Sequence, residues 1–216
     1  MAAQIAAWDD AGDGRALFLD CYRRMTEAVV DDVAAGRFAD GDWVARLLDR
    51  FADYYFVTID PPDGTDVYVP EPWLLAHAAA MSGDGQPLQL LLAGVNAHIN
   101  YDLVLTLVDL LDDEWPDADD ELRSLRRRDY DLINAVIAET ADLVQDEVLE
   151  RRSPWLDVFD RSLGRIDEHL AVRLLTRWRT QVWRHATEVL DDQVGRELRV
   201  TMIEQQCSRR ARWLLL

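Results

Sequence analysis

Residues 88–111 constrain the fold most, because this stretch is apolar around its whole circumference if it is helical. It reads LQLLLAGVNAHINYDLVLTLVDLL and is interrupted by a short polar run at its middle. A helix that is hydrophobic on every side belongs in the centre of a bundle rather than on its surface. Polar groups in such a place cost free energy unless hydrogen bonds or opposite charges meet them. We therefore expect the polar run to lie in the core and to be the most informative part of the chain.

Amphipathic patterns on both sides of this stretch predict further helices. In residues 15–35, for example, Leu17, Cys21 and Met25 recur at helical spacing with charged residues between them. Strand patterns are weak throughout, and no repeat or linker marks a second domain. Helices are predicted over residues 15–35, 42–59, 72–81, 118–151, 153–164, 167–191 and 194–216. The fold class is therefore all-α: one multi-helix bundle over residues 1–216, built around the central helix 88–111.

The charge balance excludes several classes of partner. The chain carries 41 acidic against 23 basic residues, a net charge of −18, and every basic residue is arginine. Nucleic acids and anionic membranes require basic surfaces, so neither is an expected partner. An acidic coat without lysine is typical of a protein in concentrated salt, where screening weakens self-repulsion. We interpret the chain as a halophilic, cytoplasmic protein.

Three further features bear on the compartment. Cys21 and Cys207 stand far apart in the sequence and have no metal-binding spacing, so we predict two reduced, buried thiols. Residues 1–15 lack the basic and apolar regions of a signal peptide. The central helix has the length of a membrane span, but the ionisable side chains of His98 and Asp102 favour a core helix.

The polar run contains one pair that could carry chemistry. His98 and Asp102 are four residues apart, which places them on one face of a helix, with Tyr101 beside them. Such a pair can bind one cation together, or the carboxylate can orient the imidazole for proton transfer. The alternative is that both side chains hydrogen-bond to other helices and only fix the register of the bundle.

Two asparagines lie on a different, nearly opposite face of the same helix. Asn96 and Asn100 could place a substrate or a water molecule, or they could bond to the backbone of a neighbouring helix. Gly94 stands one turn before His98 and leaves room for a helix or a ligand to approach closely.

The run GVNAHINYDL at residues 94–103 resembles the signature of an uncharacterised all-helical family, a domain of unknown function found in bacteria, archaea and some eukaryotes. The segment Arg128-Asp129-Tyr130 with Asn134, and Trp183 with Ala186, are also similar, so the resemblance covers most of the chain. It implies an all-helical fold and supplies no activity. It also implies one site, which would group His98, Asn100, Asp102, Asp129 and Asn134.

That grouping is physically reasonable. Asp129 lies on one face of the predicted helix 118–151, with Asn134 just beside that face. An antiparallel neighbour after a short loop would bring both residues near the middle of the central helix. The alternative is that Asp129 simply pairs with one of the three arginines that precede it.

Two functions remain open from the sequence. The first is a small-molecule-binding protein or metal-dependent enzyme, and the second is a non-catalytic scaffold or interaction protein in which the polar residues are structural. For the first, we predict His98 and Asp102 as the catalytic residues. The ligand would be bound by Asn96, Asn100, Tyr101, Asp129 and Asn134. A divalent metal ion, the cofactor considered, would be held by His98, Asp102 and Asp129.

Overall fold

The computed structural model describes residues 1–61, 66–83, 85–144 and 168–216, and in them it contains helices and no strand. The fold is an all-α domain, as predicted. In chain order the elements are α1 (Ala2–Asp10), α2 (Arg15–Ala34), α3 (Gly41–Ile59), α4 (Glu71–Ser82), α5 (Pro87–Ala97), the π-helical turn η1 (His98–Asp102), α6 (Leu103–Leu111), the 3₁₀ turn η2 (Trp115–Asp117), α7 (Asp120–Val144), α9 (Glu168–Asp191) and α10 (Arg196–Leu214).

Helix boundaries follow the local signals in the sequence. The side chain of Asp40 accepts a hydrogen bond from the backbone N–H of Trp43 and so caps the start of α3. α4 begins beside Pro72 and ends at Gly83, whose φ of 72° is a left-handed conformation that glycine adopts without strain. These ends lie within one or two residues of the predicted ones.

One helical segment differs from the sequence prediction. No helix was predicted before residue 15, yet α1 forms and buries Ile5 and Trp8. The signal was weak because only these two side chains of the short, alanine-rich segment reach the core. The predicted helix 118–151 is described only as far as Val144, and the predicted helix 153–164 lies outside the described residues.

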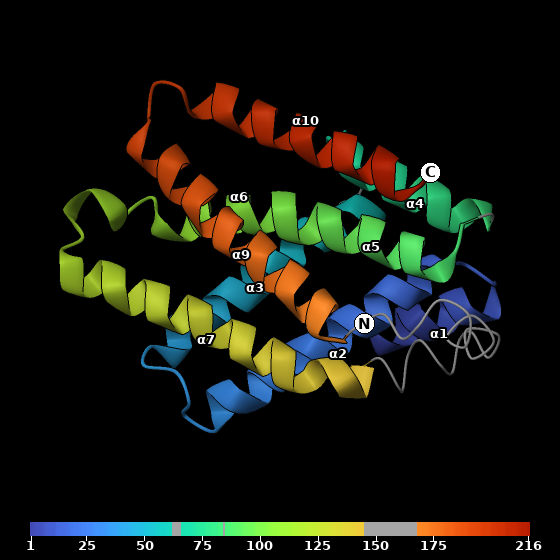
Figure 1. Ribbon diagram of the computed structural model, residues 1–216, viewed down its shortest axis with the longest axis horizontal. Helices are drawn as coiled ribbons and strands as arrows, with labels where there is room; N and C mark the ends of the chain where they lie inside the picture. The colour runs from blue at the N-terminus through green and yellow to red at the C-terminus, as the bar shows by residue number, and fades with distance from the viewer. Residues whose placement is uncertain (62–65, 84, 145–167) are drawn as a thin grey trace.

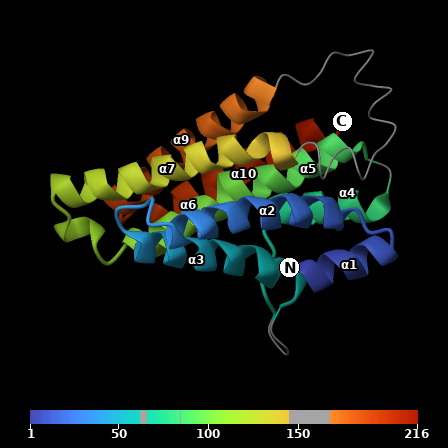
Figure 2. The ribbon, with the colours of Figure 1, turned by 90° about the horizontal axis from the view of Figure 1, so that it is seen from below.

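The continuous helical stretch α5–η1–α6 forms the centre of the bundle (Figures 1 and 2). It contacts helices on several sides: α2, α3, α4, α9 and α10. Leu103, Leu107 and Leu111 are completely buried. Burying a leucine side chain contributes roughly 1.5–3 kcal/mol relative to leaving it exposed, so this face alone stabilises the bundle substantially.

The same stretch passes a test for membrane spans by length and hydropathy. Among the described residues one helix, Pro87–Leu111, is long and apolar enough to cross a membrane. Of its most apolar part, 72% is buried inside the bundle. Other helices of the chain therefore cover most of this apolar surface.

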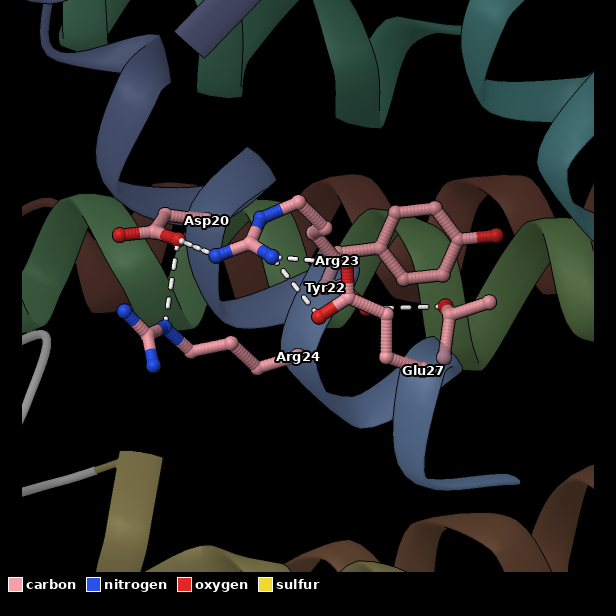
Figure 3. A network of polar contacts seen from close by, with 6 residues as sticks. Asp20, Tyr22, Arg23, Arg24 and Glu27 are labelled. Carbon is pink, nitrogen blue, oxygen red and sulfur yellow. Dashed lines mark hydrogen bonds and ion pairs between the residues drawn. The ribbon is translucent and has the colours of Figure 1, made fainter. Parts of the chain in front are cut away.

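One side of α2 carries a network of ion pairs, shown in Figure 3. The carboxylate of Asp20 accepts from Arg23 at 3.0 Å and from Arg24 at 3.3 Å, and Arg23 also pairs with Glu27 at 2.7 Å. Partly exposed pairs of this kind contribute little to stability. Tyr22 lies beside this network, but its hydroxyl takes no part in it and is buried without a hydrogen-bond partner.

Candidate functional site

The polar run of the central helix folds as a single π-helical turn. η1 covers His98–Asp102 between two α-helical halves, and all five of its residues are buried. Single-turn π segments inside α-helices are rare and are found frequently at functional sites. The sequence pattern does not indicate this turn, because apolar and polar spacing shows only the faces of a regular α-helix.

His98 and Asp102 contact each other, as their spacing predicts. His98 Nδ1 lies 3.0 Å from Oδ2 of Asp102, and the two side chains are 2% and 1% exposed. The indole Nε1 of Trp73, from α4, donates to the same Oδ2 atom at 2.8 Å. The imidazole nitrogen and the indole nitrogen therefore converge on one carboxylate oxygen, which fixes the orientation of the imidazole.

Five aromatic side chains enclose the imidazole and form what we call the aromatic box. Phe51 is stacked on the imidazole, with ring centroids 3.6 Å apart and an interplanar angle of 6°. Tyr22 approaches with its edge, at a centroid distance of 4.5 Å. The box consists of Phe18, Tyr22, Phe51, Tyr55 and Trp73.

Three polar atoms of this region are buried and have no hydrogen-bond partner: His98 Nε2, the Tyr22 hydroxyl and the Tyr55 hydroxyl. A buried polar group without a hydrogen bond costs about 1–3 kcal/mol. Three such atoms, one of them in the imidazole and two beside it, therefore need an explanation. Sequence reasoning did not find the two tyrosines. The available signal was the helical spacing of Tyr22 from Phe18, which places both on the inner face of α2.

Burial controls the protonation of the site. It lowers the pKa of His98 well below its usual value, and the positive charge of Arg179 acts in the same direction. Burial raises the pKa of Asp102, while the hydrogen bond from Trp73 opposes that shift. Burial also raises the pKa of Tyr22 and Tyr55, which keeps both hydroxyls protonated. With a neutral imidazole that donates from Nδ1, the Nε2 atom carries a free lone pair.

A small cavity lies at one side of the aromatic box. Its volume is about 10 Å³, close to that of one water-sized probe. Its wall includes Phe18, Tyr55, Trp73, His77 and Gly94. The lining contains neither His98 nor Asp102, so the two predicted catalytic side chains are enclosed by protein atoms.

At Gly94 a neighbouring helix, α2, comes close to the central helix, as the sequence predicts. A Cβ atom at this position would lie 2.8 Å from Cδ2 of Phe18, closer than real Cβ atoms come to other atoms. The absence of a side chain therefore lets α2 pack directly against α5.

Asn96 and Asn100 face α10 rather than the His98–Asp102 pair. Asn96 Nδ2 donates to the carbonyl of Cys207 at 3.0 Å, and its Oδ1 accepts from Asn100 and from Arg210, each at 3.3 Å. The prediction that these asparagines occupy a different face from His98 is confirmed. Protein groups already satisfy the Asn96 amide, which is the alternative left open from the sequence.

Asp129 bonds to the backbone of the turn between α2 and α3 and does not bond to His98. Its two carboxylate oxygens accept the backbone N–H groups of Ala39 at 3.0 Å and Asp40 at 2.7 Å, and so hold the turn between α2 and α3. Arg126 pairs with Asp40 and Glu114 instead. Neither a pairing of Asp129 with a preceding arginine nor a position at the central helix is observed.

Asn134 joins a second buried group that the sequence did not reveal. Its Oδ1 accepts from Nε of Arg179, and the Tyr130 hydroxyl donates to the Arg179 carbonyl at 2.8 Å. Arg179 is 3% exposed, its guanidinium lies 4.6 Å from the centroid of the Tyr130 ring, and its Nη2 has no partner. In the sequence it is one of many arginines on amphipathic helices, so only the packing of α7 against α9 identifies it.

Tyr101 is directed toward α10. Its hydroxyl lies 3.5 Å from Glu204, which also accepts from Tyr68 at 2.6 Å and from the backbone N–H of Glu71 at 3.0 Å. Tyr101 is 5% exposed, and the carboxylate of Glu204 already accepts hydrogen bonds from Tyr68 and Glu71. The predicted role of Tyr101 in binding a ligand therefore has no direct structural support.

The predicted metal site is not assembled. Within residues 1–61, 66–83, 85–144 and 168–216, no group of three or more His, Cys, Asp or Glu side chains is placed to hold a metal ion. His98 and Asp102 are together, but the carboxylate of Asp129 is occupied by backbone amides. The three-ligand metal site therefore receives no support. The side chains of both cysteines, Cys21 and Cys207, are buried, as predicted.

Comparison with other proteins places the chain in a family. No curated protein and no solved structure matches it. A family model described as a family of unknown function, DUF5995, matches residues 1–216, and this match agrees with the expected resemblance to an all-helical family of unknown function. The chain belongs to this family of unknown function, DUF5995.

Proposed function

We propose that this protein binds a small molecule in the core of its bundle through Nε2 of His98. The observation that carries the proposal is the contrast between the two nitrogens of this imidazole. Asp102 holds Nδ1, whereas Nε2 is buried without a partner. A histidine oriented through one nitrogen by a carboxylate presents the other nitrogen for binding or proton transfer.

The surrounding groups define the chemistry of the guest. The neutral imidazole offers a hydrogen-bond acceptor, and the hydroxyls of Tyr22 and Tyr55 offer donors. A small, uncharged molecule that carries both a donor and an acceptor, such as an alcohol or an amide, would satisfy all three groups. In an enzyme of this design, Nε2 would act as the general base and Asp102 would orient the imidazole.

Access to the site requires a local opening. The cavity beside the aromatic box holds about one water molecule, so a larger guest needs α2 and α3 to separate from the central helix. Phe51 of α3 is stacked on the imidazole, and Phe18 and Tyr22 of α2 also contact it. The π-helical turn favours a functional role for this segment, because such turns are rare and occur frequently at functional sites.

The second candidate is a non-catalytic scaffold. It is favoured by the satisfied hydrogen bonds of Asn96, Asp129 and Asn134, and by the small size of the cavity. In this case His98 and Asp102 fix the packing of the helices. The unpartnered Nε2 atom is the observation that this alternative leaves unexplained.

Histidine C2–H exchange, followed by mass spectrometry, separates the two candidates. A binding site must open without global unfolding, so exchange at His98 should not depend on urea added well below the unfolding midpoint. If exchange at His98 accelerates with urea in parallel with global unfolding, the site is sealed and the binding proposal fails. His185, whose side chain is 18% exposed, is the internal reference for an accessible imidazole.

A binding measurement complements the exchange experiment. Acetamide carries one donor group and one acceptor, and it should shift the ¹⁵N resonance of His98 Nε2 without affecting His185. The Tyr22→Phe variant removes one hydroxyl and should weaken this effect. An unchanged His98 resonance at saturating acetamide would count against a guest of this chemistry.

We also propose, from composition alone, that the acidic surface is an adaptation to concentrated salt in the cytoplasm. The net charge of −18 and the absence of lysine support this proposal.

A further inference from the structure

A second candidate site lies on the surface, at the start of α7, and we call it the arginine groove. It is an open depression of about 770 Å³ between η2, α7 and α9. Its wall includes Trp115, Arg123, Arg127, Arg128 and Trp183.

The residues of α7 in this groove form one stripe of the helix. Asp120, Arg123, Ser124, Arg127, Arg128 and Asp131 follow the three- and four-residue spacing of neighbours on a helical surface. The side of α7 that faces the bundle carries the buried Tyr130 and Ile133. The stripe is therefore the surface that the packing of the bundle leaves open.

Arg123 is held in place without a carboxylate partner. Its guanidinium carbon lies 4.6 Å from the centroid of the Trp115 ring, and Nη2 donates to the Trp115 carbonyl at 3.1 Å. Its Nε atom is buried and has no hydrogen-bond partner. Among the described residues it forms no ion pair, so a positive charge held in place by Trp115 lines the groove without a carboxylate partner.

The other two arginines extend this positive surface. Arg127 lies 5.3 Å from the centroid of the Trp183 ring and pairs with Asp131 at 2.6 Å. Arg128 is exposed and makes no ion pair within the part of the chain that the structure describes. Their neighbour Arg126 differs sharply, because it is buried and bonded to two carboxylates on the other side of the helix.

The charge of the groove is opposite to that of the whole molecule. Three arginines and two aspartates line it, in a chain with a net charge of −18, and one of the aspartates is neutralised by Arg127. Planar guanidinium groups bind carboxylates through paired donors and stack on flat rings. The two indole rings below hold the guanidinium groups of Arg123 and Arg127 in position for such contacts.

We propose that the arginine groove binds a small organic anion that joins a carboxylate to a planar aromatic ring. The carboxylate lies between Arg123 and Arg128, and the ring stacks on the guanidinium face of Arg123. This site is separate from His98 and does not depend on the function proposed for the core.

Titration with 2-naphthoate tests this site, with binding followed by saturation-transfer NMR at 0.15 M salt. Wild-type protein should bind 2-naphthoate saturably. The double variant Arg123→Gln/Arg128→Gln should bind it more weakly by a factor of about ten at the least, or not at all, because each lost charged hydrogen bond is worth a factor of about ten or more. Arg209→Gln is the control for loss of charge elsewhere, since Arg209 is exposed on α10 and its replacement removes one positive charge outside the groove. It should leave the affinity within about twofold.

Two related compounds define the chemistry of the ligand. The uncharged 2-naphthamide should bind at least tenfold more weakly than 2-naphthoate, because it lacks the negative charge. Acetate should also bind more weakly, because it lacks the ring. The proposal is overturned if 2-naphthoate does not bind, if the double variant binds it as tightly as the wild type, or if either compound equals 2-naphthoate in affinity.

Discussion

Gly94 of α5 and Phe18 of α2 lie in direct contact, so that a Cβ atom on Gly94 would be 2.8 Å from Cδ2 and 2.9 Å from Cγ of the phenyl ring. The ring cannot retreat freely, because it also packs against Tyr55, Trp73 and His98 of the site. This contact joins the N-terminal helices to the central helix just where the π-helical turn begins.

Gly94→Ala should therefore destabilise the protein by about 1–3 kcal/mol, because inserting a methyl group into a packed core forces side chains or backbone to shift. Urea denaturation measures the effect. Gly41→Ala is the matched control, since its Cβ would meet only Cγ1 of Val33 at 3.5 Å, an ordinary contact. Equal stability of the two variants would show that α2 can move away from α5 without cost.

Asp102→Leu should destabilise the protein strongly, because it leaves the N–H groups of His98 and Trp73 buried without an acceptor. Each orphaned donor costs about 1–3 kcal/mol. Asp102→Asn should cost less, since its amide oxygen can still accept one or both hydrogen bonds. Asp131→Asn removes a partly exposed ion pair and should change the free energy of unfolding by about 1 kcal/mol or less. A leucine variant as stable as the wild type would contradict the hydrogen bonding described here.

The buried histidines should make stability fall in mild acid. Burial lowers the pKa of His77 to about 4, compared with its usual value of 6.5. Between these two pH values the unfolded chain binds a proton at this residue and the folded chain does not. The free energy of unfolding therefore decreases as the pH falls from about 6.5 to about 4, by roughly 3 kcal/mol for His77 alone.

His77→Gln tests this assignment. The side chain of His77 lies 3.0 Å from the Thr58 hydroxyl through Nε2, and glutamine can keep a hydrogen bond there while losing the titration. Urea denaturation between pH 4 and pH 7 should show a smaller loss of stability in the variant. Curves that remain parallel for both proteins would place the acid sensitivity elsewhere, for example at His98, whose pKa burial also lowers.

The melting temperature should rise between dilute buffer and molar KCl. The net charge of −18 creates self-repulsion in the folded chain, and salt screens it. Differential scanning calorimetry at a series of KCl concentrations measures the rise. A melting temperature that stays constant would remove the support for adaptation to concentrated salt.

The sequence determined the helical fold, the central position of residues 88–111 and the contact of His98 with Asp102. Each of these follows from a local rule: apolar periodicity, helix caps such as Asp40, and the four-residue spacing of neighbours on one helical face. For the same reason it also predicted that Asn96 and Asn100 face away from His98.

Tertiary structure alone decided which polar groups are satisfied. Asp129 was predicted beside His98, but its partners are backbone amides at the turn between α2 and α3, nearly ninety residues away in the sequence. The aromatic box, the buried Arg179 and the pairing of Arg123 with Trp115 likewise join distant or differently oriented segments. Hydrogen-bond satisfaction depends on the distances between elements, and a periodic pattern fixes only the face of a helix on which a side chain lies.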